Sequence, residues 1–117
     1  LQRKYFDKSG WGTQMHQHVG KALEIIPQLE GKFDLVFIDA DKRNYLNYFE
    51  IILPKMNKGG IILSDNVLWS GKVVEELKAG DKDTEVLLAY NKKLATDDRV
   101  ETVLLPIRDG LTVTRVL

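Results

Sequence analysis

The sequence predicts an α/β fold that ends in an antiparallel hairpin. Two continuous apolar runs, Phe33–Ile38 and Ile61–Ser64, are typical of parallel strands that are buried on both faces. Helical patterns alternate with these runs, as expected for a sheet with crossover helices. Near the end of the chain, two β-rich runs, Val100–Ile107 and Leu111–Leu117, flank Asp109-Gly110, a dipeptide that favours a hairpin.

The composition suits a single domain over residues 1–117. Seventeen basic residues balance 17 acidic ones, so bulk charge favours neither nucleic acid nor an anionic membrane as a partner. The absence of cysteine excludes disulfides and thiolate chemistry and suits a cytoplasmic protein. No apolar run approaches the roughly 20 residues that cross a bilayer. The chain starts at Leu1 as if inside a helix, so we expect it to be the later part of a longer protein.

The elements before the first apolar run are weaker. Leu1–Lys8 is expected to be the end of a helix, which stops at Ser9-Gly10. Thr13–Val19 alternates in residue type and predicts a short strand. Gly20–Leu29 has apolar residues at helical spacing, with Pro27 weakening the end of that helix.

Two longer helices are predicted in the rest of the chain. Asn44–Met56 places aromatic and aliphatic residues on one helical face, and Asp81–Ala95 does the same. Asn57–Gly60 is expected to be a turn before the second apolar run. Val67–Gly71 is expected to be irregular, because a Trp-Ser-Gly sequence is poor helix material.

Oxygen-bearing side chains follow both apolar runs: Asp39 and Asp41 after the first, Asp65 and Asn66 after the second. Ligands of open α/β sheets bind at the carboxyl ends of the strands, so we expect these groups to share one edge. Hard oxygen ligands favour Mg²⁺, Mn²⁺ or Ca²⁺. The alternative is that Asp41 or Asn44 only caps the following helix and that Asp65-Asn66 only shapes a turn.

Three further features are open to two interpretations each. Lys42 could be a general base in a partly desolvated pocket, or a solvated surface lysine. Trp69 could line an aromatic pocket, or it could be a packing residue. His16 and His18 share a strand face, but without a third nitrogen ligand they favour a polar surface over a metal site.

The motifs then resemble a known family. Phe33–Tyr45 (FDLVFIDADKRNY), Gly59–Gly71 (GGIILSDNVLWSG) and Leu105–Thr112 (LPIRDGLT) are similar to the cation-dependent O-methyltransferases, which include the caffeoyl-CoA and catechol enzymes. The resemblance implies a Rossmann-like fold and an enzyme that uses S-adenosylmethionine as its methyl donor. It also implies a small aromatic acceptor with vicinal hydroxyl groups, and a homodimer.

The resemblance assigns the catalytic and metal-binding roles. It implies that Asp39, Asp65 and Asn66 bind the cation and that Lys42 helps to deprotonate the acceptor hydroxyl. The cation would lower the pKa of that hydroxyl, and the phenolate would attack the methyl group of the donor in line.

The remaining roles that the resemblance implies concern the donor and the acceptor. Ala22, Asp39 and Asp41 would contact S-adenosylmethionine. Trp69 and Ser70 would contact the acceptor.

One departure from the family's pattern limits this expectation. The Gly-rich loop and the acidic ribose-binding residue of the donor site are absent and would lie before Leu1. The predicted strand Thr13–Val19 would then have no neighbour to pair with. We therefore expect the C-terminal part of a methyltransferase, lacking the donor-binding strand-loop-helix and binding S-adenosylmethionine poorly by itself.

Two other classes of protein share features with this sequence. The chain could be a non-catalytic fragment that self-associates through exposed sheet edges. A phospho-acceptor receiver domain has a similar size, but it would carry an acidic pair after its first strand, where this chain has Val19-Gly20-Lys21.

Overall fold

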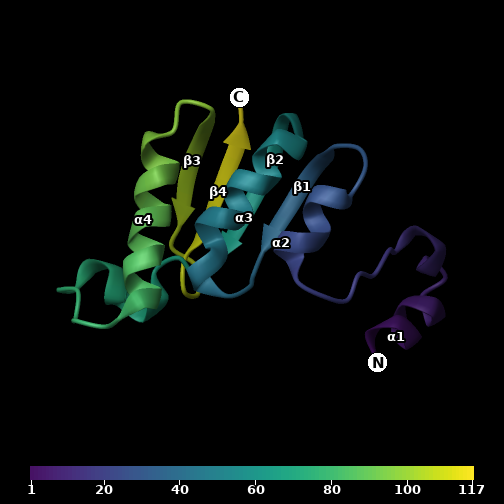
Figure 1. The fold of residues 1–117 in the computed structure, drawn as a ribbon, viewed down its shortest axis with the longest axis horizontal. Helices are drawn as coiled ribbons and strands as arrows, with labels where there is room; N and C mark the ends of the chain where they lie inside the picture. Colours follow the sequence, from purple (N-terminus) through teal and green to yellow (C-terminus); the bar gives the residue numbers. More distant parts are fainter.

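The computed structural model describes all 117 residues and contains a four-stranded sheet with helices on one of its faces. Figure 1 shows the later helices in front of the sheet, whereas the first helix lies apart from it. The helices are α1 (Gln2–Lys8), α2 (Ala22–Ile25), α3 (Tyr45–Ile52) and α4 (Lys82–Thr96). The chain also has short 3₁₀ segments: η1 (Gly12–Gln14), η2 (Ile26–Gln28), η3 (Lys42–Asn44), η4 (Leu53–Lys55) and η5 (Trp69–Val74).

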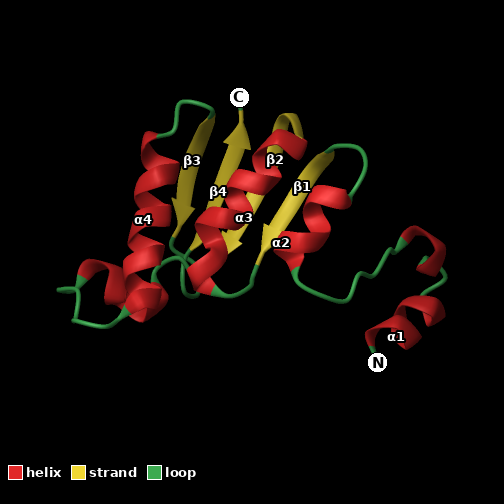
Figure 2. Cartoon of the chain, in the orientation of Figure 1, coloured by secondary structure: helices red, strands yellow, loops and turns green.

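The sheet combines one parallel and two antiparallel pairings (Figure 2). Its strands are β1 (Phe33–Ile38), β2 (Met56–Asp65), β3 (Val100–Leu105) and β4 (Leu111–Val116), in the spatial order β1-β2-β4-β3. The mixed α/β class and the C-terminal antiparallel hairpin are therefore confirmed.

The strand Phe33–Ile38 has the predicted bounds, but it is not buried on both faces. The side chains of Leu35 and Phe37 are 62% and 57% exposed, whereas Ile38 is buried. The reason is that the helices packed on the sheet lie on one side, so alternate residues of β1 face solvent (Figure 2).

The predicted strand Thr13–Val19 is wrong. Gly12–Gln14 forms a 3₁₀ turn, and the residues from Met15 to Val19 have no regular structure. Backbone groups of a strand need a partner strand, and none lies beside this segment. Instead, Arg3 donates to the carbonyls of Gly12 and Met15, at 2.8 Å and 2.7 Å.

Other predicted boundaries shift for local reasons. Both proline-containing helices end early: α2 and α3 give way to η2 and η4, which carry Pro27 and Pro54 in their first turns. The predicted turn Asn57–Gly60 lies inside β2, which pairs with β1 on both sides of a register shift. Gly59 there has φ of +81°, so the turn persists as a bulge within the strand.

The core lies between the covered face of the sheet and helices α3 and α4. Its buried apolar residues are Ile38, Tyr45, Tyr48, Phe49, Ile52, Leu53, Met56, Ile62, Val67, Leu87, Tyr90, Leu94 and Val100. The ring of Tyr90 meets those of Tyr45 and Phe49 edge to face, with centroids 5.4 Å and 6.3 Å away. These contacts fix the base of α3, the helix that follows the predicted site.

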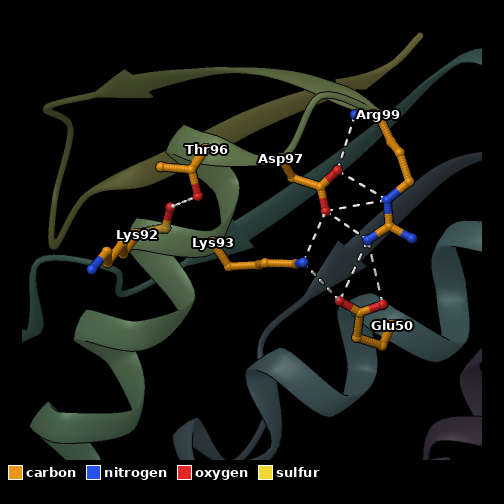
Figure 3. Close-up of polar contacts among 6 residues, drawn as sticks. All are labelled: Glu50, Lys92, Lys93, Thr96, Asp97 and Arg99. Carbon is orange, nitrogen blue, oxygen red and sulfur yellow. Dashed lines mark hydrogen bonds and ion pairs between the residues drawn. The ribbon is translucent and has the colours of Figure 1, made fainter.

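Four charged side chains connect the C-terminal ends of α3 and α4 (Figure 3). Asp97 accepts from Arg99 at 2.6 Å and lies 3.3 Å from Lys93. Glu50 of α3 approaches the same two cations, at 3.4 Å and 3.7 Å. The network therefore links α3, the end of α4 and the start of β3.

No helix has the length and apolar character that spanning a membrane requires.

Candidate functional site at the ends of two parallel strands

The parallel pairing of β1 and β2 brings two predicted ligands to one edge of the sheet. Ile38 lies opposite Ser64 in the register, so Asp39 and Asp65 each follow directly at neighbouring strand ends. The expected adjacency of the two apolar strands is confirmed. The edge then receives Lys42 from η3 and Asn66 from the loop after β2.

Lys42 is the most enclosed charged group at this edge, with only 8% of the side chain exposed. Its ammonium group donates to the hydroxyl of Tyr45 and lies 4.3 Å from the centre of that ring. On another side, the ring centre of Trp69 is 5.7 Å away. The interpretation of Lys42 as a solvated surface lysine is therefore wrong, because its side chain is buried and its amine lies near two aromatic rings.

One carboxylate and one backbone carbonyl lie near this buried ammonium group. Asp39 lies 3.9 Å from it and is 53% exposed, and the backbone carbonyl of Asp65 lies 3.5 Å from it. Burial lowers the pKa of Lys42, while the negative charges of Asp39, Asp65 and Asp109 act in the opposite direction. A lysine in this setting is easier to deprotonate than a solvated one, which is the property a general base needs.

Tyr45 fixes the position of this lysine. Its hydroxyl donates to the carbonyl of Asp65 at 2.8 Å while accepting from Lys42. Burial raises the pKa of Tyr45 far above its usual value, so the group stays a neutral phenol that can donate and accept at once. The sequence indicated Tyr45 only as one of the aromatic residues on one face of the helix predicted over Asn44–Met56.

Asp41 points toward a different set of partners. Its carboxylate accepts hydrogen bonds from the hydroxyl of Tyr48 and from the side-chain amide of Asn44. The hydrogen bond from Tyr48 is the main reason that the pKa of Asp41 is lowered. It occupies the N-cap position of η3 but accepts no backbone N–H there. The capping alternative is therefore not what holds this side chain.

Asp109 is a site residue that sequence reasoning missed. Its carboxylate accepts from the backbone N–H of Ser70 at 2.6 Å, and its other oxygen lies 3.4 Å from the amide nitrogen of Asn66. The backbone amide of Leu68 also donates to the Asp109 carbonyl, at 2.9 Å. The Asp-Gly dipeptide signalled only a hairpin turn, whereas the structure uses its aspartate to hold the loop after β2.

The loop held by Asp109 has an unusual backbone. Asn66, Trp69 and Ser70 have φ values of +61°, +51° and +55°, in the left-handed region that non-glycine residues seldom adopt. Gly110 lies so close beneath it that an added Cβ would come 2.5 Å from the side chain of Leu68. Such conformations persist only where surrounding contacts hold them, and they cluster at functional sites.

Of the predicted donor contacts, Ala22 and Asp39 line one pocket, and Asp41 is not among its lining residues. The pocket is shallow, with a volume of about 180 Å³, and it is also lined by Tyr48, which donates to Asp41. Ligand pockets usually measure about 300–1,000 Å³. This pocket is therefore too small to enclose a nucleoside-sized donor by itself.

The predicted metal ligands fit a hard cation in chemical type, since Asp39 and Asp65 offer carboxylates and Asn66 an amide oxygen. No group of three or more His, Asp or Glu side chains in the chain gathers as a metal site. His16 and His18 are exposed, and they lie on an irregular segment instead of a strand face.

Comparison with known proteins places this chain in a family. Residues 1–117 match the model of the O-methyltransferase family. Tricin synthase 2 of Oryza sativa subsp. japonica is 39% identical, over 100% of this chain and 46% of its own length. Caffeoyl-CoA O-methyltransferase 2 of Zea mays is 41% identical, over 93% of this chain and 46% of its own length.

Solved structures show the same fold. The SAH-bound methyltransferase of Podospora anserina is 32% identical with a TM-score of 0.84, over 98% of this chain and 54% of that one. The O-methyltransferase TomG of Streptomyces achromogenes, solved in complex with SAM, is 27% identical with a TM-score of 0.87, over 97% of this chain and 55% of that one.

The chain thus spans about half the length of the curated relatives it matches. The family model nevertheless covers every residue of the chain, and the relatives reach about 40% identity. The chain therefore belongs to the O-methyltransferase family.

Proposed function

We propose that this chain carries the cation-binding and acceptor-binding residues of an S-adenosylmethionine-dependent O-methyltransferase. The acceptor would be a small aromatic molecule with two neighbouring hydroxyl groups. The observation that carries the proposal is the buried ammonium of Lys42, which lies beside Asp39 at the shared end of two parallel strands. Two relatives named caffeoyl-CoA O-methyltransferase and tricin synthase support the reaction class.

In this proposal Lys42 takes the proton from the acceptor hydroxyl. Burial favours its neutral form, and Tyr45 holds the amine in place by a hydrogen bond. A divalent cation held by Asp39, Asp65 and Asn66 would supply the Lewis-acid chemistry that lowers the pKa of the acceptor hydroxyl.

Acceptor and donor would approach Lys42 from two sides. Trp69 and Ser70 lie on the strained loop and would contact the acceptor ring, because Trp69 already forms one wall around the amine of Lys42. Ala22 and Asp41 would contribute to the donor side. Once deprotonated, the acceptor oxygen attacks the methyl carbon as its bond to sulfur breaks, so catalysis is mostly alignment.

The cation site can be tested by adding Mn²⁺ to the ¹⁵N-labelled chain and following paramagnetic broadening of the amide signals. We expect broadening to centre on residues 39–42 and 65–70, and Asp65→Asn to weaken it. Asp83→Asn is the matched control, because Asp83 is a surface carboxylate paired with Arg43 at 3.0 Å. Broadening spread evenly over all acidic side chains would contradict the assignment.

The reaction is tested by transfer of a labelled methyl group from S-adenosylmethionine to catechol. We expect the full protein that contains this chain to need Mg²⁺ and to lose activity in EDTA. Asp65→Ala should abolish the cation-dependent transfer. Normal Mg²⁺-dependent turnover by that variant would remove Asp65 from the ligand set.

A second candidate is a self-associating, non-catalytic role. The observation that favours it is the exposed apolar face of the edge strand β1, where Leu35 and Phe37 lie uncovered. Sedimentation velocity should then show mass that rises with concentration, and Leu35→Lys should abolish the rise. Val19→Lys is the control, because Val19 is exposed but lies outside the sheet. A monomer at all concentrations excludes this role.

A further inference from the structure

The pairing of β2 with β4 places Asp109 beside the predicted cation ligands. Asp65, the last residue of β2, lies opposite Leu111 in this antiparallel pair. The residues just before Leu111 therefore continue alongside the loop that follows Asp65. A backbone hydrogen bond extends the contact, since the N–H of Leu68 donates to the carbonyl of Asp109 at 2.9 Å. Asp109 thus has a fixed place next to the loop that begins with Asn66.

The two carboxylate oxygens of Asp109 accept from two different groups of that loop. Oδ1 accepts from the backbone N–H of Ser70 at 2.6 Å, and Oδ2 lies 3.4 Å from the side-chain nitrogen of Asn66. The first contact is short and charge-assisted, whereas the second is long and therefore the weaker of the two. One side chain thus contacts both the segment predicted to bind the acceptor and a residue predicted to bind the cation.

The contact with Asn66 determines which end of the Asn66 amide is free. A carboxamide has an acceptor oxygen at one end and a donor NH₂ group at the other, so its hydrogen bonds set its orientation. The side-chain nitrogen of Asn66 donates to Asp109, while its Oδ1 accepts no hydrogen bond. Hard cations bind oxygen. The orientation that Asp109 imposes therefore leaves the ligating end of Asn66 available.

Only a carboxylate can serve both partners of Asp109 at once. Both partners are N–H donors, so the side chain between them must offer two acceptor atoms. The substitution Asp109→Asn keeps one oxygen and replaces the other by an NH₂ group. The oxygen should stay with Ser70, because that contact is the shorter one. The NH₂ group would then face the nitrogen of Asn66, and two donors do not pair, so Asn66 should turn its oxygen toward residue 109.

We propose that Asp109 is a positioning residue of the cation site. It holds the amide of Asn66 so that the oxygen, not the nitrogen, is left for the cation, and it fixes the acceptor loop through the N–H of Ser70. The proposal rests on the proposed function, because it takes Asn66 as a cation ligand. Replacement of a group that orients a metal ligand typically lowers metal affinity about 10–100-fold.

The test is a double-mutant cycle on cation affinity, which requires no catalysis. Mn²⁺ is titrated into the chain, and free Mn²⁺ is followed by electron paramagnetic resonance. We expect Asp109→Asn to weaken Mn²⁺ binding about tenfold or more. In the Asn66→Ala background the same substitution should have almost no further effect, because the amide through which Asp109 acts is already gone. A loss of charge alone would weaken binding equally in both backgrounds.

A second measurement needs no cation. Hydrogen exchange at the Ser70 amide should rise less in Asp109→Asn, which keeps an oxygen for that N–H, than in Asp109→Ala, which does not. The side-chain amide signal of Asn66 should shift in both variants, because its nitrogen loses its acceptor. Asp83→Asn is the matched control, since Asp83 is a surface carboxylate paired with Arg43 at 3.0 Å. It should change neither the Ser70 exchange rate nor the Mn²⁺ affinity.

Two results would overturn this proposal alone. They are an unchanged Mn²⁺ affinity in Asp109→Asn, and an equal loss of affinity in both backgrounds, which would mean that Asp109 acts by its charge or binds the cation itself. A third result would overturn the proposed cation site as well. It is an Mn²⁺ affinity that neither Asp65→Asn nor Asn66→Ala changes.

Discussion

The ammonium group of Lys42 lies 4.3 Å from the ring centre of Tyr45 and donates to the hydroxyl of the same residue. That hydroxyl donates to the carbonyl of Asp65 at 2.8 Å. One buried tyrosine therefore connects the first turn of α3, the lysine before it and the end of β2. Removal of its hydroxyl should therefore affect both the stability of the fold and the position of Lys42.

We expect Tyr45→Phe to lower the free energy of unfolding by about 1–3 kcal/mol, because it leaves a buried carbonyl and a buried ammonium short of a partner. Urea denaturation followed by circular dichroism measures the change. Tyr5→Phe is the control, since that hydroxyl belongs to a tyrosine that is 60% exposed on α1. Equal stabilities for the two variants would show that the Tyr45 hydroxyl contributes nothing.

Asp109 should control the conformation of the loop that carries Trp69 and Ser70. In Asp109→Ala the backbone N–H of Ser70 loses its 2.6 Å acceptor. A hydrogen bond to a charged group is worth about 1.5–3 kcal/mol, so amide exchange at Ser70 should rise about tenfold or more. Hydrogen exchange monitored by NMR measures it, with the surface variant Asp83→Ala as control. Unchanged exchange at Ser70 would mean that other contacts hold the loop.

The fold was predictable where the signal is local. Phe33–Ile38 has the predicted bounds because a run of apolar residues ending at an aspartate specifies a strand by itself. Thr13–Val19 failed because a strand exists only beside another strand, and alternation of residue type carries no information about a neighbour. The prediction that β1 is buried on both faces was wrong for a similar reason. Whether the second face of a strand is buried depends on which other elements cover that face of the sheet.

In the candidate site, too, local signals were predictive and contacts between distant residues were not. The strand ends bring Asp39 and Asp65 together, as the two motifs predicted. Asp109 could not be found, because its hydrogen bonds reach Ser70 and Asn66, 39 and 43 residues away in the sequence. Tyr45 was hidden by its helical spacing, which explains its buried ring but not the two hydrogen bonds of its hydroxyl.

The isolated chain should bind S-adenosylmethionine weakly or not at all. The pocket that contains Ala22 and Asp39 measures only about 180 Å³, so most of a bound donor would stay in water. Calorimetric titration in Mg²⁺ and then in EDTA measures the affinity. Micromolar binding by this chain alone would show that the donor site is complete without further residues.

The network around Asp97 should make stability depend on pH in the acid range. The hydrogen bonds from Arg99 hold the pKa of Asp97 well below its usual value of 3.8, and this side chain is only 5% exposed. A carboxylate whose pKa is lowered on folding stabilises the protein above its unfolded pKa. That contribution is lost as pH falls from about 5 toward 2.

Asp97→Asn should therefore lower the stability at pH 7 and flatten the decline below pH 5, measured by thermal unfolding across this range. Asp98→Asn is the control, because Asp98 is the exposed neighbour in the same turn. An unchanged acid slope in Asp97→Asn would assign the decline to other carboxylates.

Thr102 of β3 and Thr112 of β4 should respond in opposite ways to replacement by valine. Thr102→Val leaves the fully buried hydroxyl of Thr114 without its partner, so the free energy of unfolding should fall by about 1 kcal/mol. Thr112→Val removes a buried hydroxyl that has no partner, so the free energy of unfolding should stay the same or rise by up to about 1 kcal/mol. Urea denaturation of both variants measures the difference. A loss in Thr112→Val as large as in Thr102→Val would mean that an ordered water already pairs with Thr112, because only a lost hydrogen bond makes that change costly.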